Sequence, residues 1–196
     1  MSAKRFTFKS TFVILLAVAA LVGPLAPLTA VSAHAEKAVA PEKNPPGDIP
    51  DTQVFIPYQS AGYSLQVPEG WARSGTGPTV RFVGKLDAVA ITISKAPAKL
   101  DLAWVKDSYL PVLEKTGRAV KLGKTSTVTL PFGQALRIDY SDNSEPNVVT
   151  GKQVRLEHNL YLFEQGGKMA ALNLSAPYGA DNVDQWRLMS RSFGWK

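Results

Sequence analysis

Few residues in this 196-residue chain could carry out nucleophilic or acid–base chemistry. Cysteine is absent, and of the two histidines only His158 lies outside the first 35 residues. The chain has no Gly-x-Ser-x-Gly sequence, so a serine nucleophile of the hydrolase type is not indicated. A lone histidine is more often a hydrogen-bonded structural residue than a catalytic base, and we expect this role for His158.

Two carboxylates, Asp139 and Glu157, could act as a general acid–base pair if the fold brought them into one cleft. A hydrolase built on this pair would show raised carboxyl pKa values. We keep this hydrolase as the alternative function of the chain. No nucleotide-binding motif is present, because the glycine-containing segment 73–78 precedes a predicted strand and not a helix. The sequence therefore predicts no cofactor.

The same carboxylates have a structural explanation, because Arg137 and Arg155 lie close to them in sequence. If their two strands pair antiparallel with Arg137 opposite Glu157, then Asp139 faces Arg155. Sliding the strands by two residues brings like charges together, which is unfavourable. We therefore interpret these four residues as a structural ladder of cross-strand ion pairs.

A polar loop over 141–151 is the candidate binding region. Its candidate residues are Asp142, Asn143, Glu145 and Asn147. The loop lacks the glycine and the ligand spacing of an EF-hand, so no metal site is predicted. It is too long for a simple hairpin connection, and long loops often carry function. We expect it to contact a protein or an envelope component.

Apolar periodicity predicts that strands and two helices position these residues. The strands are expected over 53–58, 63–67, 79–83, 88–94, 119–130, 133–142, 152–164 and 168–175. A helix should begin after Asp101 as N-cap and end at Gly117. Pro111 inside it predicts a kink or a break. The last helix should open with a capping box over 181–184.

Apolar residues in the last two strands and the last helix indicate where the core lies. The helix carries an apolar stripe of Val183, Trp186, Met189 and Phe193. A two-residue turn at Gly166-Gly167 should set Leu162 opposite Ala171 and Tyr161 opposite Leu172. If side chains alternate strictly along this strand, Tyr161 and Phe163 lie on the same face as Arg155 and Glu157. Either a bulge near 157–159 reverses the pleat or helices cover both faces of the sheet.

Trp71 follows the turn Val67-Pro-Glu-Gly70, which has proline and glycine at favoured β-turn positions. A tryptophan buries a large apolar area, and a chain without disulfides depends on such residues in its core. We therefore expect Trp71 to be a structural residue and not the rim of a ligand site.

The N-terminal region predicts export. Basic residues precede the apolar run 12–22, and Ala33-His34-Ala35 fits a signal peptidase site, so residues 1–35 are read as a signal peptide. An uncleaved anchor remains the alternative, although the run is shorter than the roughly 20 residues of a membrane span. Residues 36–52, rich in Pro, Glu and Lys, are expected to form a disordered spacer. The folded domain should comprise 53–196.

Charge argues against a nucleic-acid ligand. The chain has 22 basic and 16 acidic residues, and its first 35 residues hold three basic and no acidic ones. The processed protein therefore has 19 basic and 16 acidic residues, a net charge of +3. Such a small excess does not require a polyanionic partner. We expect no nucleic-acid binding, and membrane contact only through an uncleaved N-terminal segment.

Several segments resemble the Mog1/PsbP-like family, especially its exported actinobacterial branch of LpqN-like lipoproteins. The matching segments are 63–71 (YSLQVPEGW), 132–140 (FGQALRIDY), the Gly166-Gly167 hairpin and 180–193 (ADNVDQWRLMSRSF). The resemblance implies an α+β fold in which helices sandwich an antiparallel sheet. It implies an accessory or partner-binding role and no catalytic residues. The chain lacks the lipobox cysteine of the lipoprotein branch, so lipid modification is not expected.

These observations favour a secreted, extracytoplasmic and monomeric binding module of the cell envelope that is not an enzyme. A small-ligand carrier is a further alternative, which would need a pocket of about 300 Å³ or more. Trp71, Tyr161 and Phe163 would line it. The sequence does not identify the ligand or partner.

Overall fold

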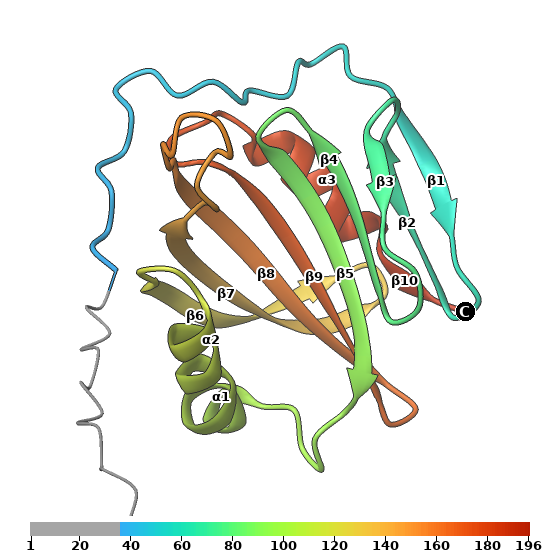
Figure 1. Cartoon of the computed structure of the whole chain (residues 1–196). Helices are drawn as coiled ribbons and strands as arrows, with labels where there is room; N and C mark the ends of the chain where they lie inside the picture. Colours follow the sequence, from blue (N-terminus) through green and yellow to red (C-terminus); the bar gives the residue numbers. More distant parts are fainter. Residues whose placement is uncertain (1–35) are drawn as a thin grey trace, which may run out of the picture. The chain divides into compact units, whose positions relative to one another are not determined.

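The computed structural model describes residues 36–196, so the predicted signal peptide lies outside the described residues. Figure 1 shows that these residues form a layered domain of strands and helices. Within the described range no helix is long and apolar enough to span a membrane.

Residues 36–196 contain a seven-stranded antiparallel sheet. Its strands are β3 (Ala72–Ser74), β4 (Thr79–Gly84), β5 (Asp87–Lys95), β6 (Lys121–Leu130), β7 (Gly133–Asn143), β8 (Arg155–Gln165) and β9 (Lys168–Pro177). Their spatial order is β3-β4-β5-β9-β8-β7-β6. The predicted hairpin register at Gly166-Gly167 is confirmed, because Leu162 lies opposite Ala171 and Tyr161 opposite Leu172.

A smaller, three-stranded sheet in the same range was not predicted. It consists of β1 (Phe55–Gln59), β2 (Tyr63–Pro68) and the C-terminal β10 (Gly194–Trp195). β2 lies between the other two and pairs antiparallel with both. This sheet packs on the same side of the large sheet as the last helix, since Tyr63 of β2 stacks on Phe193.

The first helical segment follows the sequence closely. It comprises α1 (Leu102–Trp104), a π-helical turn η1 (Val105–Tyr109) and α2 (Leu110–Thr116). Asp101 accepts a hydrogen bond from the Trp104 amide at 2.8 Å, and Gly117 ends α2 as predicted. Pro111 lies in the first turn of α2, directly after the π-helical turn. The helix continues through this proline without a break, and the π-helical turn before it is the local irregularity.

The last helix, α3 (Val183–Ser192), differs from the prediction in two ways. Asn182 occupies the N-cap position but makes no capping bond, so the predicted capping box is wrong. Asp184 instead pairs with Arg187 at 2.7 Å. Trp186, Met189 and Phe193 are buried as expected, whereas Val183 is 69% exposed.

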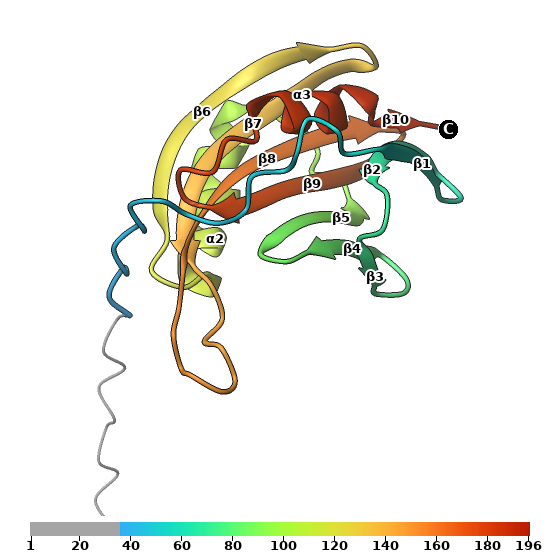
Figure 2. The ribbon, with the colours of Figure 1, turned by 90° about the horizontal axis from the view of Figure 1, so that it is seen from above.

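Helices cover both faces of the large sheet (Figures 1 and 2). Tyr161, Phe163 and Leu172 belong to the core cluster that contains Trp186 and Phe193. A second cluster on the other face joins Ile138, Leu160 and Leu162 to Val105 of the first helical segment. The pairing of β8 with both neighbours is continuous, without a bulge near 157–159. Tyr161 and Phe163 therefore share a face with Arg155 and Glu157 because helices cover both faces of the sheet, and not because a bulge reverses the pleat.

The predicted ion-pair register between β7 and β8 is wrong by four residues. Arg137 lies opposite Tyr161, and Asp139 lies opposite Asn159. Arg137 bonds instead to Asp139 on its own strand, with 2.7 Å between Nε and Oδ1. Arg155 bonds only to uncharged oxygens. Neither arginine needs a carboxylate across the strands, so charge pairing did not determine the register.

Trp71 is partly buried and packs against the core cluster of the α3 face. Its indole ring lies over Gly84, where an added Cβ would come within 2.4 Å of Cε2. The ring therefore fills space that a side chain at Gly84 would otherwise occupy.

Residues 36–51 form an extended segment, which we call the strap. Figure 1 shows it crossing the domain to reach β1. The buried side chain of Asn182 holds its second half, accepting from the Ile49 amide at 2.7 Å and donating to the Gly47 carbonyl at 2.9 Å. These contacts differ from the expectation of a disordered spacer over 36–52. Composition does not reveal them, because their partners are more than 130 residues away in sequence.

Asp87 lies beneath the strap and gives the fold a pH dependence. Burial raises the pKa of Asp87 to about 7, although Asn182 donates to its Oδ1 at 3.3 Å. Between about pH 4 and 7 the unfolded chain releases this proton while the folded protein retains it. The free energy of unfolding should therefore fall as pH rises through this window, by about 1.4 kcal/mol per unit of pKa difference.

We predict that Asp87→Asn removes this slope and stabilises the protein at pH 7. The exposed Asp107→Asn is the matched control and should leave the slope unchanged. Urea denaturation at several pH values from 4 to 8 measures the effect. A slope in Asp87→Asn equal to that of the unmodified protein would contradict the assignment.

Candidate functional site

The candidate site lies at the end of the large sheet where β7 and β8 are joined by residues 144–154, here called the 144–154 loop. Figure 2 shows this loop, in orange, extending beyond the strands. The first residues of the strap lie at its base. Two sets of contacts shape the site, one at the base of the loop and one at its tip.

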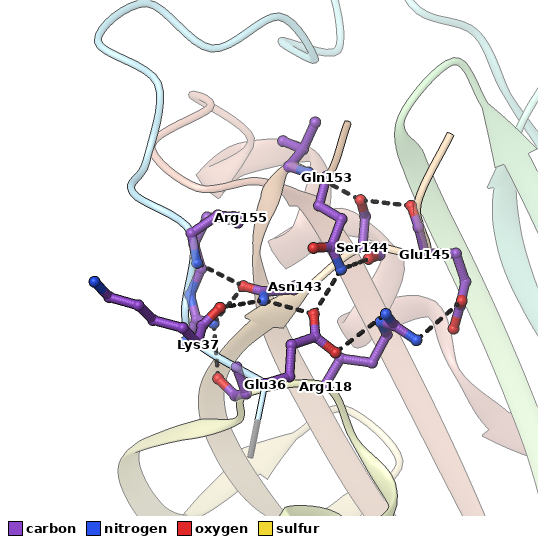
Figure 3. A network of polar contacts seen from close by, with 11 residues as sticks. Glu36, Lys37, Arg118, Asn143, Ser144, Glu145, Gln153 and Arg155 are labelled. Carbon is purple, nitrogen blue, oxygen red and sulfur yellow. Dashed lines mark hydrogen bonds and ion pairs between the residues drawn. The ribbon is translucent and has the colours of Figure 1, made fainter. Parts of the chain in front are cut away.

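Asn143, the last residue of β7, connects the strap to the base of the loop (Figure 3). Its side chain is 2% exposed and forms four hydrogen bonds. Oδ1 accepts from the Val39 amide at 3.0 Å and from Arg155 at 3.1 Å. Nδ2 donates to Glu36 at 2.8 Å and to the Lys37 carbonyl at 3.0 Å. These four bonds use the full hydrogen-bonding capacity of an amide side chain.

Glu36 brings the first described residue into the same network (Figure 3). Its carboxylate also accepts from Gln153 at 2.6 Å and pairs with Arg118 at 3.1 Å. The hydrogen bond from Asn143, followed by that from Gln153 and by the charge of Arg118, holds the pKa of Glu36 below its usual value. Arg118 also reaches Glu145 of the loop, at 3.3 Å. The strap and the loop thus share one arginine.

Arg155, the first residue of β8, is a buried cation at the base of the loop. Its guanidinium donates to the Ser141 carbonyl, the Ser141 hydroxyl, the Ala119 carbonyl and Asn143 at 2.7–3.1 Å. A buried charge is costly unless its donors are satisfied, and here neutral oxygens satisfy them. Arg155 therefore ties together β7, β8 and the chain preceding β6.

The tip of the loop has a fixed backbone. The Asn147 side chain accepts from the amides of Val149 and Thr150, both at 3.0 Å. Gly151 donates to the Asn147 carbonyl, and Asn147 donates to the Lys152 carbonyl, both at 2.8 Å. These bonds present two apolar side chains to solvent, with Val148 99% and Val149 87% exposed.

The four predicted binding residues lie at different depths, with Glu145 and Asn147 exposed and Asn143 buried. Asp142 and Asn143 belong to β7, Glu145 pairs with Arg118, and Asn147 shapes the tip. Val148 and Val149 are the exposed large apolar residues of the loop, and the sequence reasoning did not single them out. The available signal was a pair of β-branched apolar residues within a polar loop.

A hollow of about 650 Å³ lies beside the loop, on the face of the sheet opposite α3. Asn147, Thr150 and Lys152 of the loop form part of its wall. Its basic residues are Arg81, Lys85, Arg118 and Lys152, and its acidic residues are Asp142 and Glu145. The lining thus carries four positive and two negative side chains.

A histidine cluster lies in the floor of this hollow. His158 Nε2 lies 2.8 Å from Asp142 Oδ1, and Nδ1 lies 3.3 Å from Asn173 Oδ1. The imidazole stacks on Tyr140 with 4.2 Å between ring centroids. Because both ring nitrogens already have partners, the arrangement leaves no nitrogen free to activate a nucleophile. This geometry fits the structural role expected for His158.

Two neighbouring hollows with mixed polar and apolar linings lie on the α3 face. These hollows, of about 690 and 520 Å³, share Arg137, Glu157 and Asn159. Asp139 lines the smaller hollow and accepts from Arg137 and, at 3.1 Å, from Asn159. Burial raises the pKa of Glu157, whose Oε1 accepts from the Gly179 amide at 2.8 Å. The candidate acid–base pair therefore shares one hollow, but Asp139 is engaged by two side chains.

The aromatic residues proposed for a small-ligand pocket lie in different places. Tyr161 borders the larger hollow. Phe163 is buried and stacks on Phe193, and Trp71 lies over Gly84. Among residues 36–196 no group of three or more His, Cys, Asp or Glu side chains is placed to hold a metal ion.

No protein-family model matches the chain, and no curated protein is similar to it in sequence. Its fold is similar to the solution structure of cyanobacterial PsbP (CyanoP) from Synechocystis sp. PCC 6803, with a TM-score of 0.51 and 15% identity. The match covers 76% of this chain and 98% of CyanoP. This likeness shows the fold alone, and the expectation of a Mog1/PsbP-like α+β fold is confirmed.

Two further solved structures match more weakly. The Ran-binding protein Mog1p of Saccharomyces cerevisiae matches with a TM-score of 0.47 and 11% identity, over 72% of this chain and 95% of Mog1p. LpqN of Mycobacterium tuberculosis, described as involved in cell envelope biogenesis, matches with a TM-score of 0.44 and 17% identity, over 74% of this chain and 92% of LpqN. The chain spans only 45% of the length of another matched protein, from Bacteroides thetaiotaomicron.

Asn143→Ala should release the first part of the strap. The substitution leaves the Val39 amide and one donor of Arg155 without an acceptor, so we expect a loss of about 2–4 kcal/mol in the free energy of unfolding. Trypsin should then cleave faster after the exposed Lys43, while sites in the core stay protected.

Asn44→Ala provides the control, because it alters an exposed asparagine of the same strap. It should change stability by no more than about 0.5 kcal/mol. Equal stability and equal cleavage rates for both variants would show that Asn143 does not hold the strap.

Proposed function

We propose that this chain is an exported, non-enzymatic binding module of the cell envelope that contacts its partner through the 144–154 loop. It acts outside the cytoplasm as a monomer and binds no nucleic acid. Its sequence resemblance to the LpqN-like branch, on the segments quoted above, supports the envelope location. The absence of a lipobox cysteine means that attachment by that lipid modification is not part of the proposal.

The observation that carries the proposal is the exposure of Val148 and Val149 on a loop with a fixed backbone. Isolated exposed apolar residues are common on protein surfaces. Here two β-branched residues are adjacent at the end of a projecting loop, and Asn147 holds them in one conformation. A preorganised contact of this kind loses little conformational entropy on binding.

Two features support a non-enzymatic role. His158 has both ring nitrogens engaged by neighbouring side chains, which fits packing better than proton transfer. Asp139 is bonded to Arg137 and Asn159, which favours a structural role over that of a catalytic base. The hydrolase alternative therefore rests on Glu157 alone, whose pKa is raised by burial.

Recovery of binding partners from an envelope extract tests the proposal. The tagged protein should retain an envelope component, identified as a protein or a lipid, that Val148→Ser combined with Val149→Ser no longer retains. The double variant should keep the stability of the unmodified protein, because both side chains are exposed.

Val183→Ser combined with Leu188→Ser is the matched control, since these residues are 69% and 41% exposed on α3. Retention by this control and loss in the loop variant would support the proposal. Equal retention by both variants would mean that the loop is not the binding surface.

A further inference from the structure

We propose that the component bound by the 144–154 loop is a lipid surface that carries anionic head groups. This inference rests on the proposed function, because it uses the same loop. Three features of the described residues support it: the bonding of the loop tip, the charge beside it, and the place where the N-terminal segment joins the domain.

The tip pairs several of its backbone amides within the loop, which lowers the cost of bringing it to an apolar boundary. The amides of Val149 and Thr150 bond to the Asn147 side chain, and the Gly151 amide bonds to the Asn147 carbonyl. Unpaired backbone groups are costly in hydrocarbon, so a tip that enters it must satisfy them internally. The loop meets part of this requirement, through these three amides, at the point where Val148 and Val149 are exposed.

Basic side chains line the hollow at the side of the loop. Within residues 36–196, Arg81, Lys85 and Lys152 form no ion pair, although all three line the hollow next to the loop. Arg118 differs from these three residues, because it forms ion pairs with Glu36 and Glu145. Positive charges close to a membrane surface attract anionic head groups, and salt weakens this attraction. An apolar tip beside unpaired cations fits such a surface.

The N-terminal segment joins the domain at this same end. Glu36 bonds to Asn143 and Gln153 at the base of the loop. The apolar run 12–22 precedes Glu36 by only 13 residues, which span at most about 45 Å. If the run were retained in the membrane, a connection of this length would keep Glu36 near the bilayer.

The form of the tip favours a lipid surface over a protein partner. Stable protein interfaces bury roughly 800 Å² on each partner and place aromatic or arginine side chains in matching pockets. Two valines on a projecting loop offer a small contact and need no complementary pocket. A lipid surface accepts such a contact without a defined shape.

Fluorescence of Val148→Trp tests the proposal directly. The probes are vesicles of phosphatidylcholine alone and vesicles that also contain phosphatidylglycerol. With the phosphatidylglycerol vesicles, the emission of the new tryptophan should shift to the blue after subtraction of the signal of the four native tryptophans. The shift should diminish as salt is added. Val183→Trp, which places the reporter on α3, should show no shift.

Sedimentation with the same vesicles measures binding without a tryptophan reporter, so the native loop can be compared with its variants. Val148→Ser combined with Val149→Ser should lower the partition coefficient roughly tenfold or more, because two apolar side chains no longer enter the interface. Lys85→Gln combined with Lys152→Gln should lower it only for vesicles that contain phosphatidylglycerol.

The outcomes separate this inference from the proposed function. No blue shift with either vesicle, or an equal shift for Val183→Trp, would overturn the lipid assignment. If a protein is then recovered from the envelope extract in a loop-dependent manner, the proposed function stands with a protein partner. If neither vesicles nor an envelope component depend on the loop, both proposals are wrong.

Discussion

Two buried asparagine side chains, Asn143 and Asn182, supply the hydrogen bonds on which the arrangement of the strap depends. The strap has no strand partner for its backbone along most of its length, so its polar groups must be satisfied in another way. Asn143 bonds to the Val39 amide and Asn182 to the Ile49 amide, and both side chains are 2% exposed. Together they hold the strap against the sheet, and Asn143 holds the first described residue, Glu36, at the base of the 144–154 loop.

The sequence predicted most elements of this fold, because their signals are local. Asp101 and Gly117 mark the ends of the first helical segment, and Gly166-Gly167 sets the β8–β9 register. The register of β7 against β8 failed because charge pairing assumed that Arg137 and Arg155 need carboxylates across the strands. Arg137 pairs within its strand, and Arg155 is satisfied by neutral oxygens of several segments. Those contacts depend on the assembled fold.

The candidate site could be predicted only in outline. Loop length indicated the correct region, but polar residue type did not indicate which side chains are free. Asn143 is buried against the strap and the exposed Glu145 pairs with Arg118, whereas Val148 and Val149 are exposed without a side-chain partner. The strap itself was invisible to composition, since a Pro-rich and charged segment is ordinarily disordered. Its partners come from residues more than 100 positions away, which no local pattern encodes.

Amide hydrogen exchange at Val39 and Ile49 tests the central claim most directly. Each amide donates to a buried asparagine oxygen, at 3.0 and 2.7 Å respectively. Both should exchange far more slowly than the amides of residues 40 and 42–44, which lie in the exposed middle of the strap. Exchange of all these amides at the rate of an unstructured peptide would show that the asparagines do not hold the strap. The placement of Glu36 at the base of the 144–154 loop would then also be wrong.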